Sequence, residues 1–262
     1  MLINIYYLFT SVNKTIPIII ILILIAIPSF IIIKDPISIA YPFNFLYTFQ
    51  YNKPFILNVK SIYKNDHLIK ENFTQIQSEI RNILKIKSIP TVDNIYGTSN
   101  KQIKDKNDGW RIYMIKSGNN IKNNADRIPT LSHIVENDPD VISCLVSILQ
   151  PHSKIPPHIG YYRGVYRYQI GIIIPKDREN CFITVDDNNY HWIEGESIIF
   201  DDNYTHSVKN DTDEIRVIVY LDIRKKFKNK ILDKINSSAL NLILNSTYAK
   251  NEAKKTEVIE ST

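Results

Sequence analysis

The chain has 262 residues, 44% of them hydrophobic, and a formal net charge of +5. This length accommodates one or two domains, and the apolar content is sufficient for a packed core. Lysines and arginines are scattered over loops and the C-terminal segment. The sequence therefore lacks the basic patch that marks nucleic-acid-binding proteins, and it predicts no nucleic-acid partner.

After a short N-terminal segment, residues 1–14, the stretch 15–33 is uncharged and almost wholly apolar. Its 19 residues come close to the ~20 that a helix needs to cross a bilayer. A cleaved signal peptide is a poorer match, because only Lys14 precedes the stretch and no small-residue cleavage site follows it. A buried core helix would not be apolar on all sides over this length. The sequence therefore predicts a single-pass membrane protein whose topology Lys34 and Asp35 leave open.

The segment that follows, residues 34–58, is rich in aromatic residues and irregular. It either skirts the membrane interface or packs on the next domain. Residues 67–86 carry apolar side chains at helical spacing and predict an amphipathic helix. A polar loop is expected from Ile89, then a strand from Trp110 and a second short helix after Pro129.

The segment between Ile142 and Asp222 is expected to form a barrel. It contains several short apolar strands, and turn signals separate them at 187–189 and 194–196. Short strands at close spacing with turn signals are typical of a barrel or a sandwich. The sequence therefore predicts a mostly β domain over residues 59–240.

Alternation along these strands assigns side chains to faces. Ser147 shares a face with Leu145 and Leu149, while Arg167 and Gln169 lie opposite the apolar row of their strand. Arg216 likewise lies opposite its strand's apolar row. A buried guanidinium without a partner is very costly. An inward-pointing arginine therefore implies an acidic protein side chain or an acidic ligand.

Beyond Asp222 the chain is basic, and residues 231–243 predict a helix on the outside of the barrel. Residues 241–262 are expected to form a C-terminal tail, disordered from Ala249 onward. The two cysteines, Cys144 and Cys181, lie in apolar runs and are expected to be buried thiols. A disulfide between them is left open.

Two histidines stand at strand ends. His158 follows two prolines, which fix its backbone, and His206 follows an apolar strand. Neutral imidazoles are common metal ligands, and a two-histidine site with open positions suits Fe(II). A carboxylate ligand is usual two residues after the first histidine, but Gly160 stands there. The neighbouring Asp201 and Asp202 are interpreted as turn residues rather than ligands.

Arg216 follows His206 by ten positions. Two histidines with such an arginine are the arrangement that 2-oxoglutarate requires, because its keto-acid end chelates iron and its distal carboxylate reaches the arginine.

The motifs SILQPHSKIPPHIG, YRYQIGIIIPK, WIEGESIIFDDNYTHSVKND and IRVIVYLDI together resemble the aspartyl/asparaginyl β-hydroxylase family of Fe(II)- and 2-oxoglutarate-dependent dioxygenases. The resemblance runs from about Trp110 to Asp222. It implies a double-stranded β-helix (jelly-roll, cupin-like) with flanking helices, here preceded by one transmembrane helix. The family lacks the third carboxylate ligand, so Gly160 is expected.

The resemblance also implies roles for individual residues. His158 and His206 match the iron ligands, and Arg216 matches the residue that holds the distal carboxylate of 2-oxoglutarate. Further cosubstrate-binding positions match Trp110, Ser147, Arg167 and Gln169. The last of these departs from the histidine common in the family, and glutamine can donate a hydrogen bond but cannot carry charge.

The resemblance implies a membrane-anchored dioxygenase. It would use O₂, convert 2-oxoglutarate to succinate and CO₂, and hydroxylate a C–H bond. A protein substrate, hydroxylated on the β-carbon of Asp or Asn, is slightly favoured, and a lipid acyl chain is the alternative. Two rivals are a non-catalytic binding module on the same barrel and a structural membrane protein.

Overall fold

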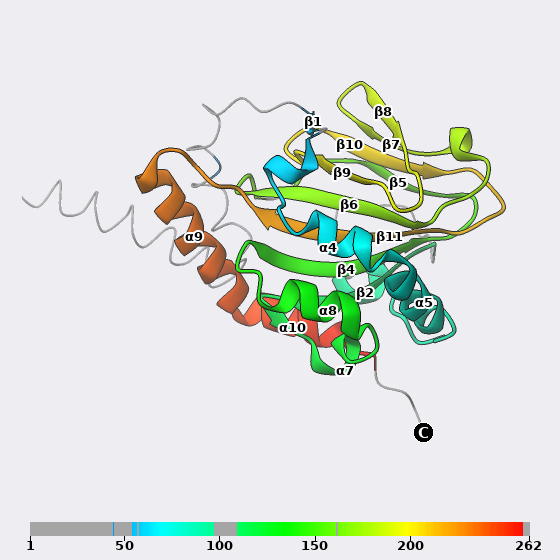
Figure 1. Cartoon of the computed structure of the whole chain (residues 1–262), viewed down its shortest axis with the longest axis horizontal. Coiled ribbons are helices and arrows are strands. Elements are labelled where there is room, and N and C mark those ends of the chain that lie inside the picture. Colours follow the sequence, from blue (N-terminus) through cyan, green and yellow to red (C-terminus); the bar gives the residue numbers. More distant parts are fainter. Residues whose placement is uncertain (1–43, 45–53, 57, 97–108, 161, 259–262) are drawn as a thin grey trace, which may run out of the picture.

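The fold consists of two antiparallel sheets packed face to face (Figure 1). The computed structural model describes residue 44 and residues 54–56, 58–96, 109–160 and 162–258. The larger sheet contains, in spatial order, β1 (Phe55–Ile56), β9 (Ser197–Phe200), β6 (Val165–Ile173), β11 (Arg216–Arg224), β4 (Val141–Leu149), β2 (Trp110–Ser117) and β3 (Asn119–Asn120). The smaller sheet contains β5 (Ser153–His158), β10 (His206–Asn210), β7 (Cys181–Val185) and β8 (Asn188–His191). This arrangement confirms the predicted mostly β, double-stranded barrel.

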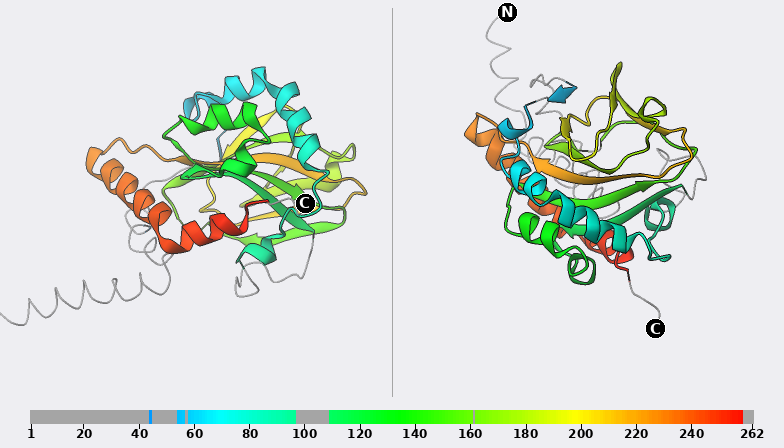
Figure 2. Two further views of the ribbon diagram at one scale, coloured as in Figure 1. Left: turned by 90° about the horizontal axis from the view of Figure 1, so that it is seen from below. Right: turned by 45° about the vertical axis from the view of Figure 1, so that its right-hand side comes forward.

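Helices cover the side of the larger sheet that faces away from the smaller one (Figure 2). They are α4 (Asp66–Glu71), α5 (Phe73–Ile83), α7 (Lys122–Ala125), α8 (Pro129–Glu136), α9 (Lys230–Asn245) and α10 (Thr247–Lys255). The remaining helical elements are α6 (Val92–Tyr96) and the 3₁₀ turns η2 (Val59–Ser61) and η3 (Arg178–Asn180). The predicted helix after Pro129 is confirmed as α8.

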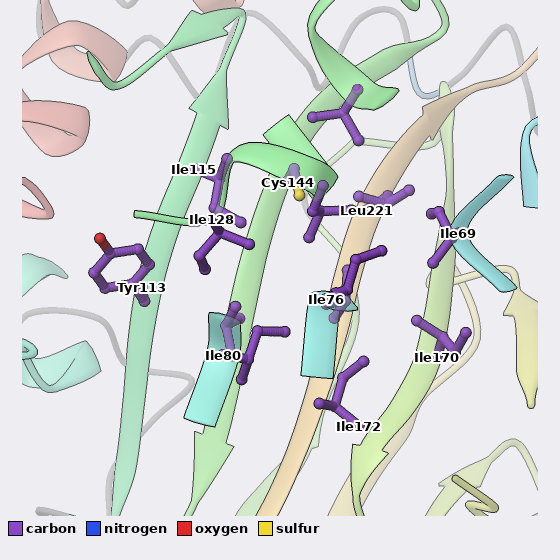
Figure 3. Close-up of a cluster of buried hydrophobic side chains, with 14 of the residues drawn as sticks. Ile69, Ile76, Ile80, Tyr113, Ile115, Ile128, Cys144, Ile170, Ile172 and Leu221 are labelled. Atoms are coloured by element: carbon purple, nitrogen blue, oxygen red, sulfur yellow. The ribbon is translucent and has the colours of Figure 1, made fainter. Parts of the chain in front are cut away.

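Strand alternation divides the apolar residues of the larger sheet between two cores, as the sequence predicts. The outer core lies between the sheet and the helices (Figure 3) and includes Ile69, Ile76, Ile80, Tyr113, Ile115, Ile128, Cys144, Ile170, Ile172 and Leu221. The inner core lies between the two sheets and consists of Leu149, Ile155, Cys181, Ile183, Val185, Trp192, Ile198, Phe200, Val208 and Ile218.

The single amphipathic helix expected over 67–86 is two helices, α4 and α5, separated at Asn72. The backbone of Asn72 leaves helical geometry at φ −100° and ψ 16°, and its side-chain amide donates to the carbonyl of Leu68 at 2.9 Å. Asparagine often competes with the helix in this way, because its side chain offers the backbone an alternative hydrogen bond.

The prediction of disorder from Ala249 onward is wrong for residues 249–258, because α10 continues to Lys255 and the described chain is ordered as far as Val258. The hydroxyl of Ser246 caps α10 by accepting from the Ala249 amide at 3.1 Å. Beyond the helix, the amide of the buried Val258 donates to Asn124 Oδ1 at 2.9 Å. These contacts order the segment through long-range partners. The polar loop expected from Ile89 also contains a short helix, α6.

At the N-terminal side, β1 pairs with β9 at the edge of the larger sheet. Of the two alternatives for residues 34–58, this strand pairing favours packing on the domain over a position at the membrane interface for residues 55–56. The predicted anchor over 15–33 lies outside the described residues. Within the described ranges, none of the helices combines the length and the apolar character needed to span a bilayer.

The two cysteines are free thiols on opposite sides of the larger sheet. Cys144 belongs to the outer core and Cys181 to the inner core. The disulfide that the sequence left open is therefore absent between them. Burial raises the pKa of both thiols, that of Cys181 to about 11, so both are protonated at neutral pH.

Candidate metal and cosubstrate site

The two predicted metal ligands lie side by side on the smaller sheet. His158 ends β5, His206 begins β10, and the antiparallel register pairs them directly. Their ring centroids are 4.1 Å apart. Two residues 48 positions apart in the sequence are thus brought together by strand pairing.

Backbone carbonyls select the tautomer of both neutral rings. Nδ1 of His158 lies 2.8 Å from the carbonyl of Pro156, and Nδ1 of His206 lies 3.0 Å from that of Tyr204. A carbonyl only accepts, so Nδ1 must be the protonated nitrogen and Nε2 carries the free lone pair. Metal-binding histidines usually donate their second ring N–H in this manner.

Burial keeps both imidazoles neutral. Desolvation, followed by the neighbouring His158, lowers the pKa of His206 to about 3. Desolvation also lowers the pKa of His158. Both rings therefore present a lone pair rather than a charge at neutral pH, which is the form that binds a metal.

The position where a carboxylate would be the third metal ligand is blocked by another side chain. The side chain of Asp202 fills the space beside Gly160, where an added Cβ would lie 1.9 Å from Asp202 Oδ2. The backbone amide of Gly160 donates to the Asp202 carbonyl at 2.7 Å. Across the described ranges, no group of three or more His, Cys, Asp or Glu side chains is arranged to hold a metal ion. The site therefore offers two histidines and a nearby carboxylate.

The adjacent aspartates differ in role. Asp201 accepts from the Asn203 amide at 3.2 Å and forms a buried ion pair with Lys225 at 2.6 Å, as suits a turn residue. Asp202 is fully buried, and its Oδ2 accepts from Arg167 Nε at 2.7 Å. Its Oδ1 has no hydrogen-bond partner among the described residues. A buried, unsatisfied carboxylate oxygen is costly, so this atom suits a group bound beside the histidines.

Arg167 does not stand free for a cosubstrate. Its guanidinium pairs with Asp202 and also with Asp222, and it lies over the Tyr220 ring, 5.0 Å from the centroid. The inward arginine predicted at this position thus has protein carboxylates as partners. It lies at the histidine end of the barrel and joins β6 to the loop before His206.

Arg216, unlike Arg167, is surrounded by neutral groups. It is 1% exposed, and Nη1 donates to Ser147 Oγ at 3.2 Å. Ser147 also accepts from Trp110 Nε1 at 3.0 Å, so three residues predicted to bind the cosubstrate meet. Within the described part of the chain, no carboxylate pairs with Arg216, and its Nε has no partner. Burial lowers its pKa to about 10, which leaves it charged at neutral pH.

A buried, charged guanidinium without a counterion fits an anionic ligand. The acidic end of 2-oxoglutarate is such a ligand. Together with two neutral histidines and the free Asp202 Oδ1, this donor set fits a metal and a dicarboxylic acid.

The remaining predicted residue, Gln169, is buried on the inner face of β6. Its Oε1 accepts from Trp192 Nε1 at 3.0 Å. Trp192 also lies 5.0 Å from the Arg216 guanidinium, measured to its ring centroid. Sequence reasoning missed Trp192 and the role of Asp202. One feature of the sequence could have pointed to Asp202: Gly160 stands where a ligand side chain is usual, which leaves room for another side chain.

Comparison with known proteins places the chain in a family. The family model for aspartyl/asparaginyl beta-hydroxylase matches residues 70–226, which is more than half of the chain. The chain belongs to this family. The match takes in both histidines and every strand except β1.

Two curated relatives match most of this chain, which spans less than two thirds of the length of either one. It is 30% identical over 183 residues to an ornithine lipid ester-linked acyl 2-hydroxylase of Rhizobium tropici, covering 70% of this chain and 64% of that protein. It is 25% identical over 170 residues to the aspartyl/asparaginyl beta-hydroxylase of Homo sapiens, covering 63% of this chain and 21% of that protein. Among solved structures, a 2OG-Fe(II) oxygenase family oxidoreductase from Burkholderia pseudomallei aligns with a TM-score of 0.32 at 15% identity, over 44% of this chain and 67% of that one.

Proposed function

We propose that this protein is an Fe(II)- and 2-oxoglutarate-dependent hydroxylase, held at a membrane by residues 15–33. Two observations carry the proposal: two neutral histidines lie side by side, and the buried Arg216 has no carboxylate partner among the described residues. Family membership supports it. A binding module would need neither a metal-competent histidine pair nor a separate anion site.

In this proposal His158 and His206 hold iron through their Nε2 atoms. Bound iron would supply the activation of O₂, for which protein side chains alone are poorly suited. The Pro156 and Tyr204 carbonyls orient the two rings. Asp202 Oδ1 would accept a hydrogen bond from a water molecule in the position that a third ligand would otherwise occupy.

The cosubstrate would lie along the inner face of the larger sheet. Arg216 would bind its distal carboxylate, with Ser147 and Trp110 fixing the guanidinium at one end. The apolar inner core would exclude water from this region, which strengthens the charge interaction. Arg167 would hold Asp202 in place rather than contact the cosubstrate directly.

A protein substrate, hydroxylated on an Asp or Asn side chain, is the first candidate and follows the human relative's name. A lipid acyl chain is the second. It is favoured by the higher identity to the rhizobial acyl hydroxylase and by Ile159, an apolar side chain that is 48% exposed directly after His158.

The test supplies the full chain with Fe(II), 2-oxoglutarate and O₂ and measures succinate. The expected result is succinate formation that is lost in His158→Ala and His206→Ala. Mass spectrometry of added peptide and lipid pools then identifies which class gains one oxygen atom. Iron-independent succinate formation, or none with any substrate pool, would contradict the proposal.

A further inference from the structure

One buried tryptophan contacts two of the residues predicted to bind the cosubstrate. Trp192 lies between β8 and β9 and is fully buried. Its indole N–H donates to Gln169 Oε1 at 3.0 Å, and the Arg216 guanidinium lies 5.0 Å from its ring centroid. Gln169 belongs to β6 and Arg216 to β11, which are neighbouring strands. The tryptophan therefore couples two donors that lie on different strands.

The indole N–H determines which way the Gln169 amide points. An indole nitrogen can only donate, so the amide must turn its oxygen toward Trp192. The two ends of an amide have nearly the same shape, and hydrogen-bond partners decide between them. With the oxygen engaged, the Gln169 NH₂ group points away from Trp192. Among the described residues, the amide's one side-chain hydrogen bond is the one that its oxygen accepts from Trp192.

The same ring stabilises the charged donor. An arginine over the face of a tryptophan is attracted by the ring's electrons, and the attraction grows when water is excluded. Arg216 is 1% exposed, and its Nη1 also donates to the Ser147 hydroxyl at 3.2 Å and to the Ser147 carbonyl at 3.5 Å. The stacked ring therefore restricts the directions in which the guanidinium can present its N–H groups.

We propose that Trp192 is a positioning residue for the 2-oxoglutarate carboxylate, because it turns the Gln169 NH₂ group and the Arg216 guanidinium toward one anion. The inference rests on the proposed function. The fixed amide would supply a directed hydrogen-bond donor without a charge. Removing the indole N–H would let the amide rotate and present an oxygen, which repels a carboxylate.

The test measures binding of 2-oxoglutarate to the Fe(II)-loaded full chain by anaerobic calorimetric titration, without turnover. Trp192→Phe keeps an aromatic ring under Arg216 but removes the N–H donor, and Gln169→Leu removes the amide. Each change should weaken binding about 5- to 10-fold, the value of one hydrogen bond. The double variant should bind no more weakly than Gln169→Leu alone, because Trp192 acts through Gln169. Iron affinity should stay unchanged.

Gln77→Leu is the matched control. It removes a glutamine that donates to the Ile172 carbonyl at 2.7 Å from α5, on the helix side of the same sheet, and should leave binding unchanged. Gln169→Glu provides a second route if Trp192→Phe folds poorly. A glutamate still accepts from Trp192 but offers no donor and carries a negative charge, so binding should be lost.

Unchanged binding in Trp192→Phe, or tight binding in Gln169→Glu, would overturn the inference. So would a double variant whose loss equals the product of the two single losses, since Trp192 would then act only by packing. If the wild-type protein binds iron but no 2-oxoglutarate, the proposed function fails, and this inference fails with it.

Discussion

The outer and inner faces of the larger sheet are made by alternate residues of the same strands, yet they differ in chemistry. On β6, Ile170 and Ile172 point into the outer core, whereas Arg167 and Gln169 point between the sheets. The outer face is packed by helices and contributes apolar burial. The inner face holds buried polar groups whose bonds are left incomplete. Side-chain parity thus separates a face that contributes apolar packing from the face that carries the proposed site.

The largest expected effect is at the proposed metal ligands. His206→Ala should weaken Fe(II) binding by at least about 100-fold, because the proposed site has two protein ligands among the described residues and one of them is removed. The measurement is an anaerobic iron titration. His152→Ala is the control, since His152 is an exposed histidine paired with Asp213, and it should bind iron normally. An equal loss of iron affinity in His206→Ala and His152→Ala would contradict the assignment of His206 as a metal ligand.

A second change tests why the site has no third ligand. Gly160→Asp should not tighten iron binding, because its side chain collides with Asp202. Overpacking of this kind costs about 1–3 kcal/mol of unfolding free energy. Denaturant unfolding and iron titration measure both quantities. Adding Asp202→Ala should relieve the collision and raise iron affinity above that of Gly160→Asp. Tighter binding by the single variant would contradict the steric explanation.

On the outer face the expected effect is on stability alone. Ile170→Ala should lower the free energy of unfolding by about 2–5 kcal/mol, the usual range for emptying a fully buried aliphatic site. Urea unfolding measures this loss. The affinity for 2-oxoglutarate should be unchanged, although Ile170 directly follows Gln169 in the chain. A changed affinity in the folded variant would show that the two faces are not separate.

The smallest effect concerns pH. The folded-state pKa of His206 is about 3, below its ordinary value of 6.5, so the unfolded chain binds more protons between these values. Stability of the metal-free protein should therefore fall as pH drops from about 6.5 toward 3, and His158 should add to the fall. Unfolding measured at about pH 7 and about pH 5 tests this. His206→Gln should reduce the difference, and an unaltered slope would contradict the assignment.

The sequence predicted which side chains of a strand share a face, because this depends on local periodicity. A strand alternates its side chains whatever its neighbours are. This is why the inward positions of Gln169 and Arg216 follow from the pattern alone. For Ser147 the pattern gave only the face that it shares with Leu145 and Leu149, because both faces of that strand are apolar. The pairing of His158 with His206 was also proposed, from their places at strand ends and from resemblance to a known family, because alternation within a strand does not join them.

What the sequence could not predict depends on partners far along the chain. The Arg167–Asp202 pair joins residues 35 positions apart, so neither neighbourhood reveals it. The direction of Trp192 is set by packing between the sheets rather than by strand alternation, since it lies between strands. The ordering of Val258 likewise requires Asn124, 134 positions away.

The central claim is that two histidines and Arg216 form one site for iron and 2-oxoglutarate. The most direct test is anaerobic equilibrium binding of 2-oxoglutarate to the iron-loaded wild type and to Arg216→Ala and Arg216→Lys. The account predicts one 2-oxoglutarate per iron in the wild type. It also predicts a loss of roughly 10- to 100-fold in Arg216→Ala, from a charged hydrogen bond, and a smaller loss in Arg216→Lys. Unchanged iron binding should accompany both. Loss of iron with normal 2-oxoglutarate affinity in Arg216→Ala would contradict the account.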